Sequence, residues 1–377
     1  MAGSQQIISG RGCIGEIPKI LKRLRINKYL LVCDSGFGFI EGHEVFEQAE
    51  IPYRKFDSFT SNPLYSDVCN GVNIFNSEGC EAIVAVGGGS AIDVAKCIKL
   101  FCRLKKNTDF LSQTYFENDV ALIAAPTTAG TGSESTRFAV IYKNGMKQSV
   151  HDYSIIPNYA VLDANALKSL PTYQKKCTLL DALCQGIESW WSVNSNKESK
   201  HYSKIAVETI LKYAHAYLFE NSLESAENIM FAANHAGRAI NITQTTAPHA
   251  MSYKISSLCH IPHGHAVAIC LPAVWEFMMN HMELCLDVRG KDYLHDTFLD
   301  IGKVFRVQTV EDAIRSFKDF LVKLSISSPS IEKKEDLALL AQSVNPIRLS
   351  NNPVKLDERT LYELYVKIFS PKYLEEL

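Results

Sequence analysis

A short apolar run that ends directly in three glycines limits most strongly how this chain can fold. Residues 82–86 (Ala-Ile-Val-Ala-Val) have the composition of a buried strand, and Gly87-Gly-Gly-Ser90 follows at once. Residues 91–101 then carry apolar side chains at helical spacing. A helix that begins on a glycine turn presents backbone N–H groups and a positive dipole end, which suit a phosphate. A tight strand-to-helix turn without a ligand is the alternative.

The same alternation of strands and helices runs through the first half of the chain. Strands are expected at residues 29–33, 51–56, 82–86 and 122–125, and helices at 67–77 and 91–101. Loops rich in Gly, Ser and Thr follow the strands, as in a dinucleotide-binding fold. This pattern predicts an α/β domain with a mostly parallel sheet.

The second half of the chain has helical spacing almost throughout. Helices are expected at residues 177–193, 200–218, 226–243, 267–279, 293–305, 310–324 and 357–369. The boundary falls near Leu170-Pro171, because proline cannot continue a helix but starts one readily. We therefore expect an α/β domain at residues 1–170 and an all-α domain at 171–377. Residues 325–334 are the expected exposed connector.

Composition excludes several classes of function. The 377 residues include 39 basic and 41 acidic side chains, so no basic surface for nucleic acid or an anionic membrane is expected. Apolar runs are too short to span a bilayer, and the first residues do not resemble a signal peptide. The eleven cysteines form no CxxC pair, which is typical of thiols in a reducing compartment. These features predict a cytoplasmic protein.

Two further features near the strand ends suit a dinucleotide. Thr127, Thr128 and Thr131 lie on a glycine-containing loop after the expected strand at 122–125, where hydroxyls can bind phosphate or ribose oxygens, although turns use the same residues. Asp34 directly follows the strand at 29–33. A carboxylate there can accept hydrogen bonds from ribose hydroxyls and repels a 2′-phosphate, which favours NAD over NADP. Asp109 follows a helix instead, and we interpret it as a solvated charge.

A second group of residues suits a divalent metal. Asp181 and Gln185 are one helical turn apart, and His249 and His263 follow later in the chain. Two oxygen donors on one helix together with two imidazoles would form a four-ligand pocket. Isolated histidines are more often ordinary surface or core residues, so the spacing alone is a weak signal.

Four motifs together resemble the iron-containing (group III) alcohol dehydrogenase family. They are Gly87-Gly-Gly-Ser-Ala-Ile-Asp-Val-Ala-Lys96, Pro126-Thr-Thr-Ala-Gly-Thr-Gly-Ser-Glu134, Asp181-Ala-Leu-x-x-x-Ile-Glu188 and Pro262-His-Gly264. The motifs occur in order and span nearly the whole chain. The resemblance implies a dehydroquinate synthase-like architecture, a nicotinamide coenzyme, a catalytic metal (Fe²⁺, alternatively Zn²⁺) in an interdomain cleft, and a homodimer or larger oligomer.

The resemblance also assigns site residues. It implies metal ligands at Asp181, His249 and His263. The coenzyme contacts that it implies are Asp34, Asn62, Gly87, Gly88, Gly89, Ser90, Asp93, Thr127, Thr128, Thr131 and Lys147.

The sequence departs from the family pattern at two positions. Gln185 stands where the family usually has a histidine ligand, and Tyr253 stands where another histidine usually occurs. A neutral amide oxygen is a weaker ligand for Fe²⁺ or Zn²⁺ than imidazole, so we expect weaker binding, an altered metal preference or a lost metal. Tyr253 or a water would exchange a proton with the alcohol oxygen.

Two further stretches look most similar to the branch that reduces phosphonoacetaldehyde to 2-hydroxyethylphosphonate. They are Ile187-Glu-Ser-Trp-Trp-Ser-Val-Asn-Ser195 and Asn351-Asn-Pro-Val354. A phosphonate substrate requires a cation, for which Arg137 is the first candidate and Lys254 the second, although either can be an ordinary surface charge.

Several other functions stay open from the sequence. The alternative substrates are sulfoacetaldehyde and an uncharged short-chain aldehyde or diol. Glycerol-type dehydrogenase and dehydroquinate synthase chemistry share the implied architecture, but the latter would need more phosphate-binding cations than this chain offers. A non-catalytic coenzyme or metal sensor is the alternative outside enzymes, because Gln185 weakens the metal site.

Overall fold

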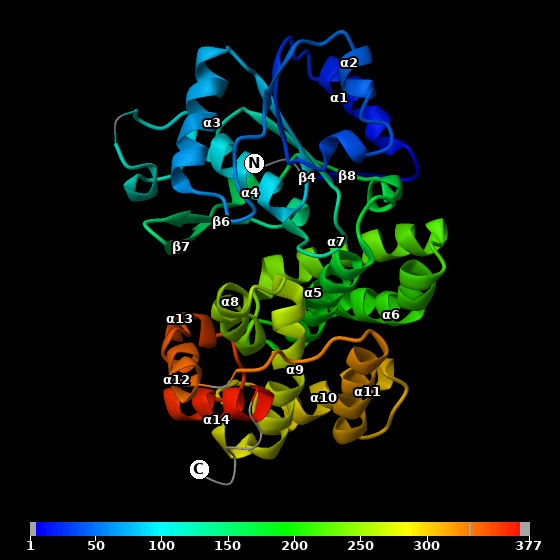
Figure 1. The fold of residues 1–377 in the computed structure, drawn as a ribbon, viewed down its shortest axis with the longest axis vertical. Coiled ribbons are helices and arrows are strands. Elements are labelled where there is room, and N and C mark those ends of the chain that lie inside the picture. Colours follow the sequence, from blue (N-terminus) through cyan, green and yellow to red (C-terminus); the bar gives the residue numbers. More distant parts are fainter. Residues whose placement is uncertain (1–4, 107, 332, 370–377) are drawn as a thin grey trace. The chain divides into compact units, whose positions relative to one another are not determined.

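The computed structural model describes residues 5–106, 108–331 and 333–369, and these form two compact units (Figure 1). The first unit extends to Pro171 and also contains His215–Gly237. The second unit contains Thr172–Ala214 and the chain from Arg238 onward.

A parallel sheet is the centre of the first unit. Within the described residues, six parallel strands lie in the order β1-β8-β5-β4-β2-β3. Their bounds are Gln6–Ser9 (β1), Tyr29–Cys33 (β2), Tyr53–Phe56 (β3), Ala82–Gly87 (β4), Ala121–Pro126 (β5) and Tyr159–Leu162 (β8). The expected mostly parallel sheet is confirmed. The strand expected at 51–56 begins two residues later, and the sequence interpretation missed β1 and β8.

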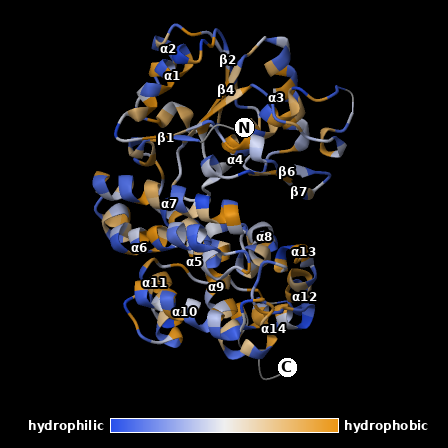
Figure 2. Ribbon diagram, turned by 180° about the vertical axis from the view of Figure 1, so that it is seen from behind, coloured by the Kyte–Doolittle hydropathy of each residue, from blue (hydrophilic) through white to orange (hydrophobic). Residues whose placement is uncertain are grey.

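Helices cover both faces of this sheet because its central strands are apolar on both sides. Leu30 and Ile83 pack toward α3 (Tyr65–Ser77) and α4 (Gly89–Phe101) in one core. Leu31 and Val84, which point the other way, pack in a second core. That core also contains residues of α1 (Ile17–Arg23) and α2 (Val45–Gln48). Hydrophobic colour on β2 and β4 in Figure 2 marks these buried strands.

A β-hairpin in the first unit was not predicted. β6 (Phe138–Lys143) pairs with β7 (Met146–His151) in antiparallel register. Asn144 and Gly145 form the turn with φ of 53° and 74°, the backbone that a two-residue hairpin turn requires. The Asn-Gly pair was therefore a usable signal. Lys143 in this hairpin forms an ion pair with Asp109, so this charge at the surface is partly exposed, as expected, but also paired.

The second unit is helical, as expected. The helices from Thr172 onward, including parts of α6 and α7 that belong to the first unit, are Thr172–Trp191 (α5), Lys197–Phe219 (α6), Leu223–Thr243 (α7), Ala247–Cys259 (α8), His263–Asn280 (α9), Lys291–Val304 (α10), Val310–Lys323 (α11), Lys334–Gln342 (α12), Pro346–Leu349 (α13) and Glu358–Phe369 (α14). The sequence interpretation missed α8, α12 and α13. Most described residues of 325–334, which connect α11 to α12, are exposed as expected, although Ile326 and Ile331 are buried.

The apolar helix α9 organises the second unit. It packs against α5, α8, α11 and α14, and its residues from Gly264 to Trp275 are buried. Short 3-10 turns elsewhere in the chain occur at Cys13–Glu16, Phe37–Phe39, Phe110–Ser112, Ser133–Ser135, Tyr153–Ile155, Ala164–Leu167 and Met282–Leu284. Among the described residues, every helix is too short or too polar to cross a membrane.

Candidate coenzyme and metal sites

The carboxyl ends of β2, β4 and β5 bring the first group of predicted residues together. The register pairs Cys33 with Val86 and Gly87 with Pro126, so Asp34, the glycine turn and the threonine loop leave the sheet at one edge. The Thr127 N–H donates to the Gly87 carbonyl at 3.0 Å. In parallel sheets ligands bind at this edge.

Asp34 ties two of these loops together. Its Oδ1 accepts from the Gly36 N–H at 2.9 Å, and its Oδ2 accepts from the Gly88 N–H at 3.0 Å. A Cβ at Gly87 would lie 2.7 Å from Asp34 Oδ2, so glycine is required there. Asp34 therefore positions the glycine turn, and each carboxylate oxygen can accept a further hydrogen bond.

The glycine turn leads into α4 and contacts the threonine loop. A Cβ at Gly89 would lie 2.8 Å from Thr131 Cγ2, and Thr128 lies within 4 Å of the corresponding position at Gly88. The Ser90 hydroxyl donates to the Ser61 carbonyl at 2.6 Å, which places the segment containing Asn62 beside the helix start. The two loops thus form one surface in front of α4.

Asp93 on α4 is partly buried and bonds to other residues of the first unit. It accepts hydrogen bonds from Ser133 Oγ at 2.6 Å and from the Val140 N–H at 2.8 Å. Lys96 donates to Ser133 Oγ and Thr136 Oγ1, both at 3.0 Å. Burial raises the pKa of Asp93 and lowers that of Lys96, and each charge partly offsets the effect on the other. This pair anchors the segment after the threonine loop.

Arg137 and Lys147 lie in the same part of the first unit. The Arg137 guanidinium lies over the rings of Phe138 and Tyr153, at 4.6 and 4.8 Å from their centroids. Stacking of this kind orients the guanidinium plane. Lys147 lies on β7 opposite Tyr142, and its charge lowers the pKa of Asp93 against the larger effect of burial.

Three predicted metal-ligating residues converge in the second unit. Asp181, His249 and His263 each offer one donor atom, and these atoms lie within 4.8 Å of one another. His249 Nε2 is 3.2 Å and His263 Nε2 is 4.0 Å from Asp181 Oδ1. One carboxylate oxygen and two imidazole nitrogens are a donor set that fits Fe²⁺ or Zn²⁺.

The close packing of α9 on α5 makes this convergence possible. α8 ends at Cys259, His260 takes a left-handed φ of 53°, and α9 begins at His263. The next residue, Gly264, is so close to α5 that a Cβ there would lie 1.9 Å from the Cys177 carbonyl oxygen. Glycine at this position therefore lets His263 reach Asp181.

Hydrogen bonds fix both imidazole rings. His249 Nδ1 lies 2.5 Å from Glu188 Oε1. Ser252 donates its hydroxyl proton to the His249 carbonyl at 2.8 Å, so its oxygen can only accept from His263 Nδ1, which lies 3.3 Å away. Both rings are thus held through Nδ1 and direct Nε2 toward Asp181. The motif that begins at Asp181 contains Glu188, but the sequence alone gives no sign of this contact with His249.

The pocket combines a buried carboxylate with positive partners. Burial opposes the charge of Asp181, but hydrogen bonding with His249 and the charge of His263 hold the pKa of Asp181 below its ordinary value. Burial likewise opposes a charged His249, yet the charge of Glu188 and hydrogen bonds with Asp181 and Glu188 raise its pKa to about 10. The pocket therefore favours a cation beside Asp181.

Gln185 and Tyr253 adjoin this group. Gln185 is buried and forms a side-chain hydrogen bond with Asp181 that lowers the pKa of the carboxyl group. The Tyr253 ring is parallel to that of His263 within 3°, with 5.3 Å between the centroids. Both departures from the family pattern thus lie at the metal-ligating group. Lys254 follows Tyr253 on α8.

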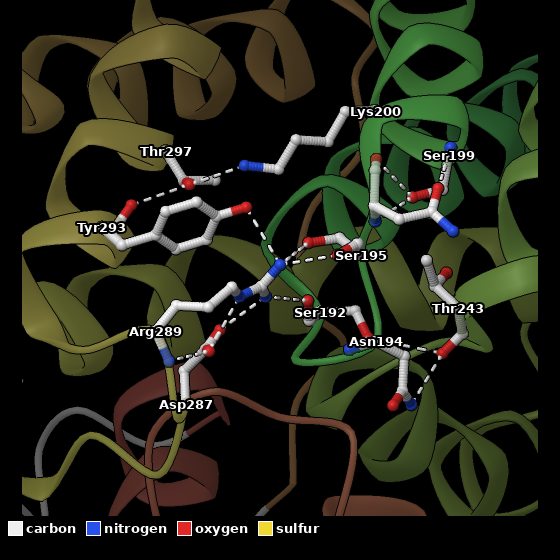
Figure 3. A network of polar contacts seen from close by, with 11 residues as sticks. Ser192, Asn194, Ser195, Ser199, Lys200, Thr243, Asp287, Arg289, Tyr293 and Thr297 are labelled. Carbon is white, nitrogen blue, oxygen red and sulfur yellow. Dashed lines mark hydrogen bonds and ion pairs between the residues drawn. The ribbon is translucent and has the colours of Figure 1, made fainter.

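Arg289 anchors the end of α5, the helix that carries Asp181 (Figure 3). Its guanidinium donates to the carbonyls of Ser192 at 2.9 Å and Ser195 at 2.6 Å, just beyond the last residue of the helix. Asp287 holds the guanidinium with both carboxylate oxygens. A cation at the carboxyl end of a helix also stabilises the helix dipole.

Comparison with known families identifies the chain. The model of iron-containing alcohol dehydrogenases matches residues 4–164, and the model of the C-terminal domain of the same family matches residues 176–369. The chain belongs to the iron-containing alcohol dehydrogenase family. It is therefore an oxidoreductase that acts on CH–OH groups.

Similar proteins span several activities of iron-containing alcohol dehydrogenases. A probable alcohol dehydrogenase, EutG of Escherichia coli, is 31% identical over 70% of this chain and 66% of its own length. A phosphonoacetaldehyde reductase of Streptomyces viridochromogenes is 29% identical over 75% of each chain. The crystal structure of sulfoacetaldehyde reductase from Bifidobacterium kashiwanohense with NAD⁺ superposes with a TM-score of 0.86 at 24% identity, covering 97% of both chains. The fold is thus that of the iron-containing alcohol dehydrogenases.

The stretches that suggested the phosphonate branch support α8. Asn351 Nδ2 donates to the Thr245 carbonyl at 3.2 Å, and Asn194 Nδ2 donates to Asn351 Oδ1 at 2.8 Å. Trp191 Nε1 donates to Thr246 Oγ1 at 2.9 Å. These contacts hold the backbone that leads into α8. α8 is the helix that carries His249, so these contacts support the segment before it.

Proposed function

We propose that this iron-containing alcohol dehydrogenase reduces phosphonoacetaldehyde to 2-hydroxyethylphosphonate with NADH. The convergence of the donor atoms of Asp181, His249 and His263 within 4.8 Å carries the metal-dependent part of the proposal. The similarity to a phosphonoacetaldehyde reductase supports the choice of substrate. Asp34 at the coenzyme edge supports NADH over NADPH, because its carboxylate would repel a 2′-phosphate.

Asp181, His249 and His263, with Gln185 beside them, would hold a divalent metal. A bound metal supplies Lewis acidity at the carbonyl oxygen, and a bound nicotinamide supplies the hydride. Asp181 contributes the negative charge of the ligand group, and Glu188 and Ser252 orient the two imidazoles. Tyr253, whose ring is placed by stacking on His263, gives the proton of its Oη to the carbonyl oxygen as hydride reaches the carbonyl carbon, and regains a proton from water.

The coenzyme would be held by the surface in front of α4. Backbone N–H groups of Gly89 and Ser90 at the helix start bind the pyrophosphate. Thr128 and Thr131 offer hydroxyls on the adjoining loop, and Asp34 accepts hydrogen bonds from the adenosine ribose. Asn62 and Lys147 complete this set. Asp93 acts indirectly by anchoring the segment that follows the threonine loop.

The phosphonate group requires a cation, and we propose Arg137. Phe138 and Tyr153 fix the plane of its guanidinium, and a planar fork matches the oxygens of a phosphonate. Lys254 on α8 is the alternative. Truncation of the correct cation should impair phosphonoacetaldehyde reduction without affecting an uncharged aldehyde.

A substrate panel tests this proposal. NADH and NADPH oxidation would be followed with metal-assayed protein and phosphonoacetaldehyde, sulfoacetaldehyde or propanal, each with Fe²⁺, Zn²⁺ or Mn²⁺. We expect highest kcat/KM with phosphonoacetaldehyde and NADH, and a loss of about 10- to 100-fold in Arg137→Ala, since a charge-assisted hydrogen bond contributes about 1.5–3 kcal/mol. Propanal reduction by that variant should be unchanged.

Each failure of the panel has a separate meaning. Equal activity on propanal would refute the phosphonate assignment, and a preference for sulfoacetaldehyde would replace it. If Lys254→Ala rather than Arg137→Ala loses phosphonoacetaldehyde reduction, Lys254 is the residue that binds the phosphonate group. Activity that survives both His263→Ala and removal of metal would refute the metal-dependent reaction. Coenzyme binding without turnover on any aldehyde would favour a sensor.

A further inference from the structure

Glu188 is a fully buried carboxylate that holds a proposed metal ligand from behind. It lies on α5, two helical turns after Asp181. Its Oε1 is 2.5 Å from His249 Nδ1. Its Oε2 accepts from the Thr246 N–H at 2.7 Å and from the Thr246 hydroxyl at 2.9 Å. Burial of an anion is costly, so this residue requires an explanation.

The surroundings of Glu188 compensate its negative charge. Three donors point at its two oxygens, and the start of α8 directs its positive dipole end toward the carboxylate. Trp191 Nε1 in turn donates to the Thr246 hydroxyl at 2.9 Å, which fixes that side chain. The carboxylate is therefore held in one orientation relative to the His249 ring.

This orientation determines which nitrogen of His249 carries a proton. A carboxylate only accepts hydrogen bonds, so Nδ1 must keep its proton when Nε2 gives up its own to bind a metal. Nε2, on the opposite side of the ring, lies 3.2 Å from Asp181 Oδ1 and is the atom left to bind a metal. Carboxylates that bond a ligating histidine in this way also raise its basicity.

We infer that Glu188 is a positioning residue that sets the metal affinity of this site through His249. The inference rests on the proposed metal role of Asp181, His249 and His263. Gln185 adds no charge to the proposed metal site. In addition to Asp181, Glu188 therefore supplies a second buried negative charge, which it places behind His249 and which helps to compensate a divalent cation. A site with the weaker ligand Gln185 therefore depends strongly on this carboxylate.

The Glu188→Gln variant tests this role because it changes one acceptor into a donor at almost constant volume. If the NH2 group of the glutamine faces His249 Nδ1, that nitrogen must accept a hydrogen bond, and the ring proton moves to Nε2. If the NH2 group faces Thr246 instead, it meets the N–H and hydroxyl donors of that residue. Zn²⁺ affinity would be measured by equilibrium dialysis against a series of chelator-buffered Zn²⁺ concentrations. We expect a decrease of about 10- to 100-fold relative to the unmodified chain.

Two control variants separate positioning from stability. Ser189→Ala alters the neighbouring, equally buried residue of α5 and should leave Zn²⁺ affinity unchanged. Thr246→Val removes the hydroxyl that donates to Glu188 and accepts from Trp191, but keeps the Glu188 carboxylate on His249. This variant should lower the Tm of the metal-free protein but leave Zn²⁺ affinity nearly unchanged.

The outcomes distinguish this inference from the proposed function. If the unmodified chain binds no Zn²⁺ or Fe²⁺, the proposed metal site itself is wrong. If it binds Zn²⁺ and a folded Glu188→Gln protein binds equally well, the role of Glu188 is refuted. Should that variant not fold, Glu188→Asp replaces it, because the shorter carboxylate withdraws from Nδ1; undiminished Zn²⁺ affinity in that variant would refute the role equally.

Discussion

Tyr253 couples a proton-bearing hydroxyl to the ring of a proposed metal ligand. Its stacking on His263 fixes the ring, so Tyr253→Phe removes only the hydroxyl. We expect kcat for aldehyde reduction to fall by about 100-fold or more, the usual contribution of a general acid. Zn²⁺ affinity measured by dialysis should stay unchanged, because the stacked ring is retained.

A second tyrosine provides the matched control for this change. Tyr173 Oη lies 2.8 Å from His265 Nδ1, a histidine outside the proposed ligand group. Tyr173→Phe should therefore leave kcat unchanged. If Tyr253→Phe also retains full kcat, a water molecule supplies the proton and the assignment to Tyr253 is incorrect.

Residue types together with the family resemblance suggested the donor atoms of the proposed metal group, but not the groups behind them. Asp181, His249 and His263 are recognisable because metals prefer carboxylate and imidazole ligands. The bond from Glu188 to His249 joins residues 61 positions apart and depends on the distance between α5 and α8. No local pattern encodes that distance. The bond from Ser133 to Asp93, 40 positions away, is likewise not encoded in the motif that contains Asp93.

At the level of secondary structure elements, the contact between α5 and α9 controls the metal site. A Cβ at Gly264 would lie 1.9 Å from the Cys177 carbonyl and 2.9 Å from Asp181 Cβ. Gly264→Ala should therefore push α9 from α5 and withdraw His263 from Asp181. We expect a Zn²⁺ affinity lower by about 100-fold, a typical cost of misplacing a functional group by about 1 Å. Overpacking should also destabilise the protein by about 1–3 kcal/mol.

A glycine in another helix of the same unit is the control. A Cβ at Gly302 on α10 would meet no heavy atom closer than 3.5 Å, which is ordinary contact. Gly302→Ala should leave Zn²⁺ affinity unchanged and raise Tm slightly, because alanine favours a helix more than glycine. Normal metal binding by Gly264→Ala would show that α5 and α9 can adjust without separating the ligands.

Most elements were predictable where apolar spacing is regular. The buried strand β2 and the helix α11 match their predicted positions closely. β1 escaped prediction because it is short and lies at the edge of the sheet, with Gln6 and Ser9 exposed and Ile7 and Ile8 half-buried. α8 escaped because its buried face contains His249 and Ser252, so polar site residues interrupt the apolar pattern. The residues proposed to bind or orient the metal ligands therefore made this helix hard to predict from apolar spacing.

At the scale of the whole molecule, the two proposed ligand sites belong to different compact units. The proposed metal ligands come from α5, α8 and α9, whereas the coenzyme residues come from the sheet edge, α4 and the β6–β7 hairpin of the first unit. A ligand stabilises the structure that binds it, by about 2.7 kcal/mol at a free concentration of 100 times Kd. Each ligand should therefore protect a different set of backbone amides.

Hydrogen exchange followed by mass spectrometry would test this division. We expect Zn²⁺ to slow exchange in α5, α8 and α9 by up to about 100-fold for amides that exchange by local opening. NADH without metal should instead protect α4 and residues 127–132. Protection of α4 by Zn²⁺ alone, or of α8 by NADH alone, would contradict the division, because neither segment offers a proposed ligand to that molecule. At a Zn²⁺ concentration that just saturates the unmodified chain, α5, α8 and α9 of the Glu188→Gln protein should no longer be protected from exchange. NADH should still protect α4 and residues 127–132 of that protein.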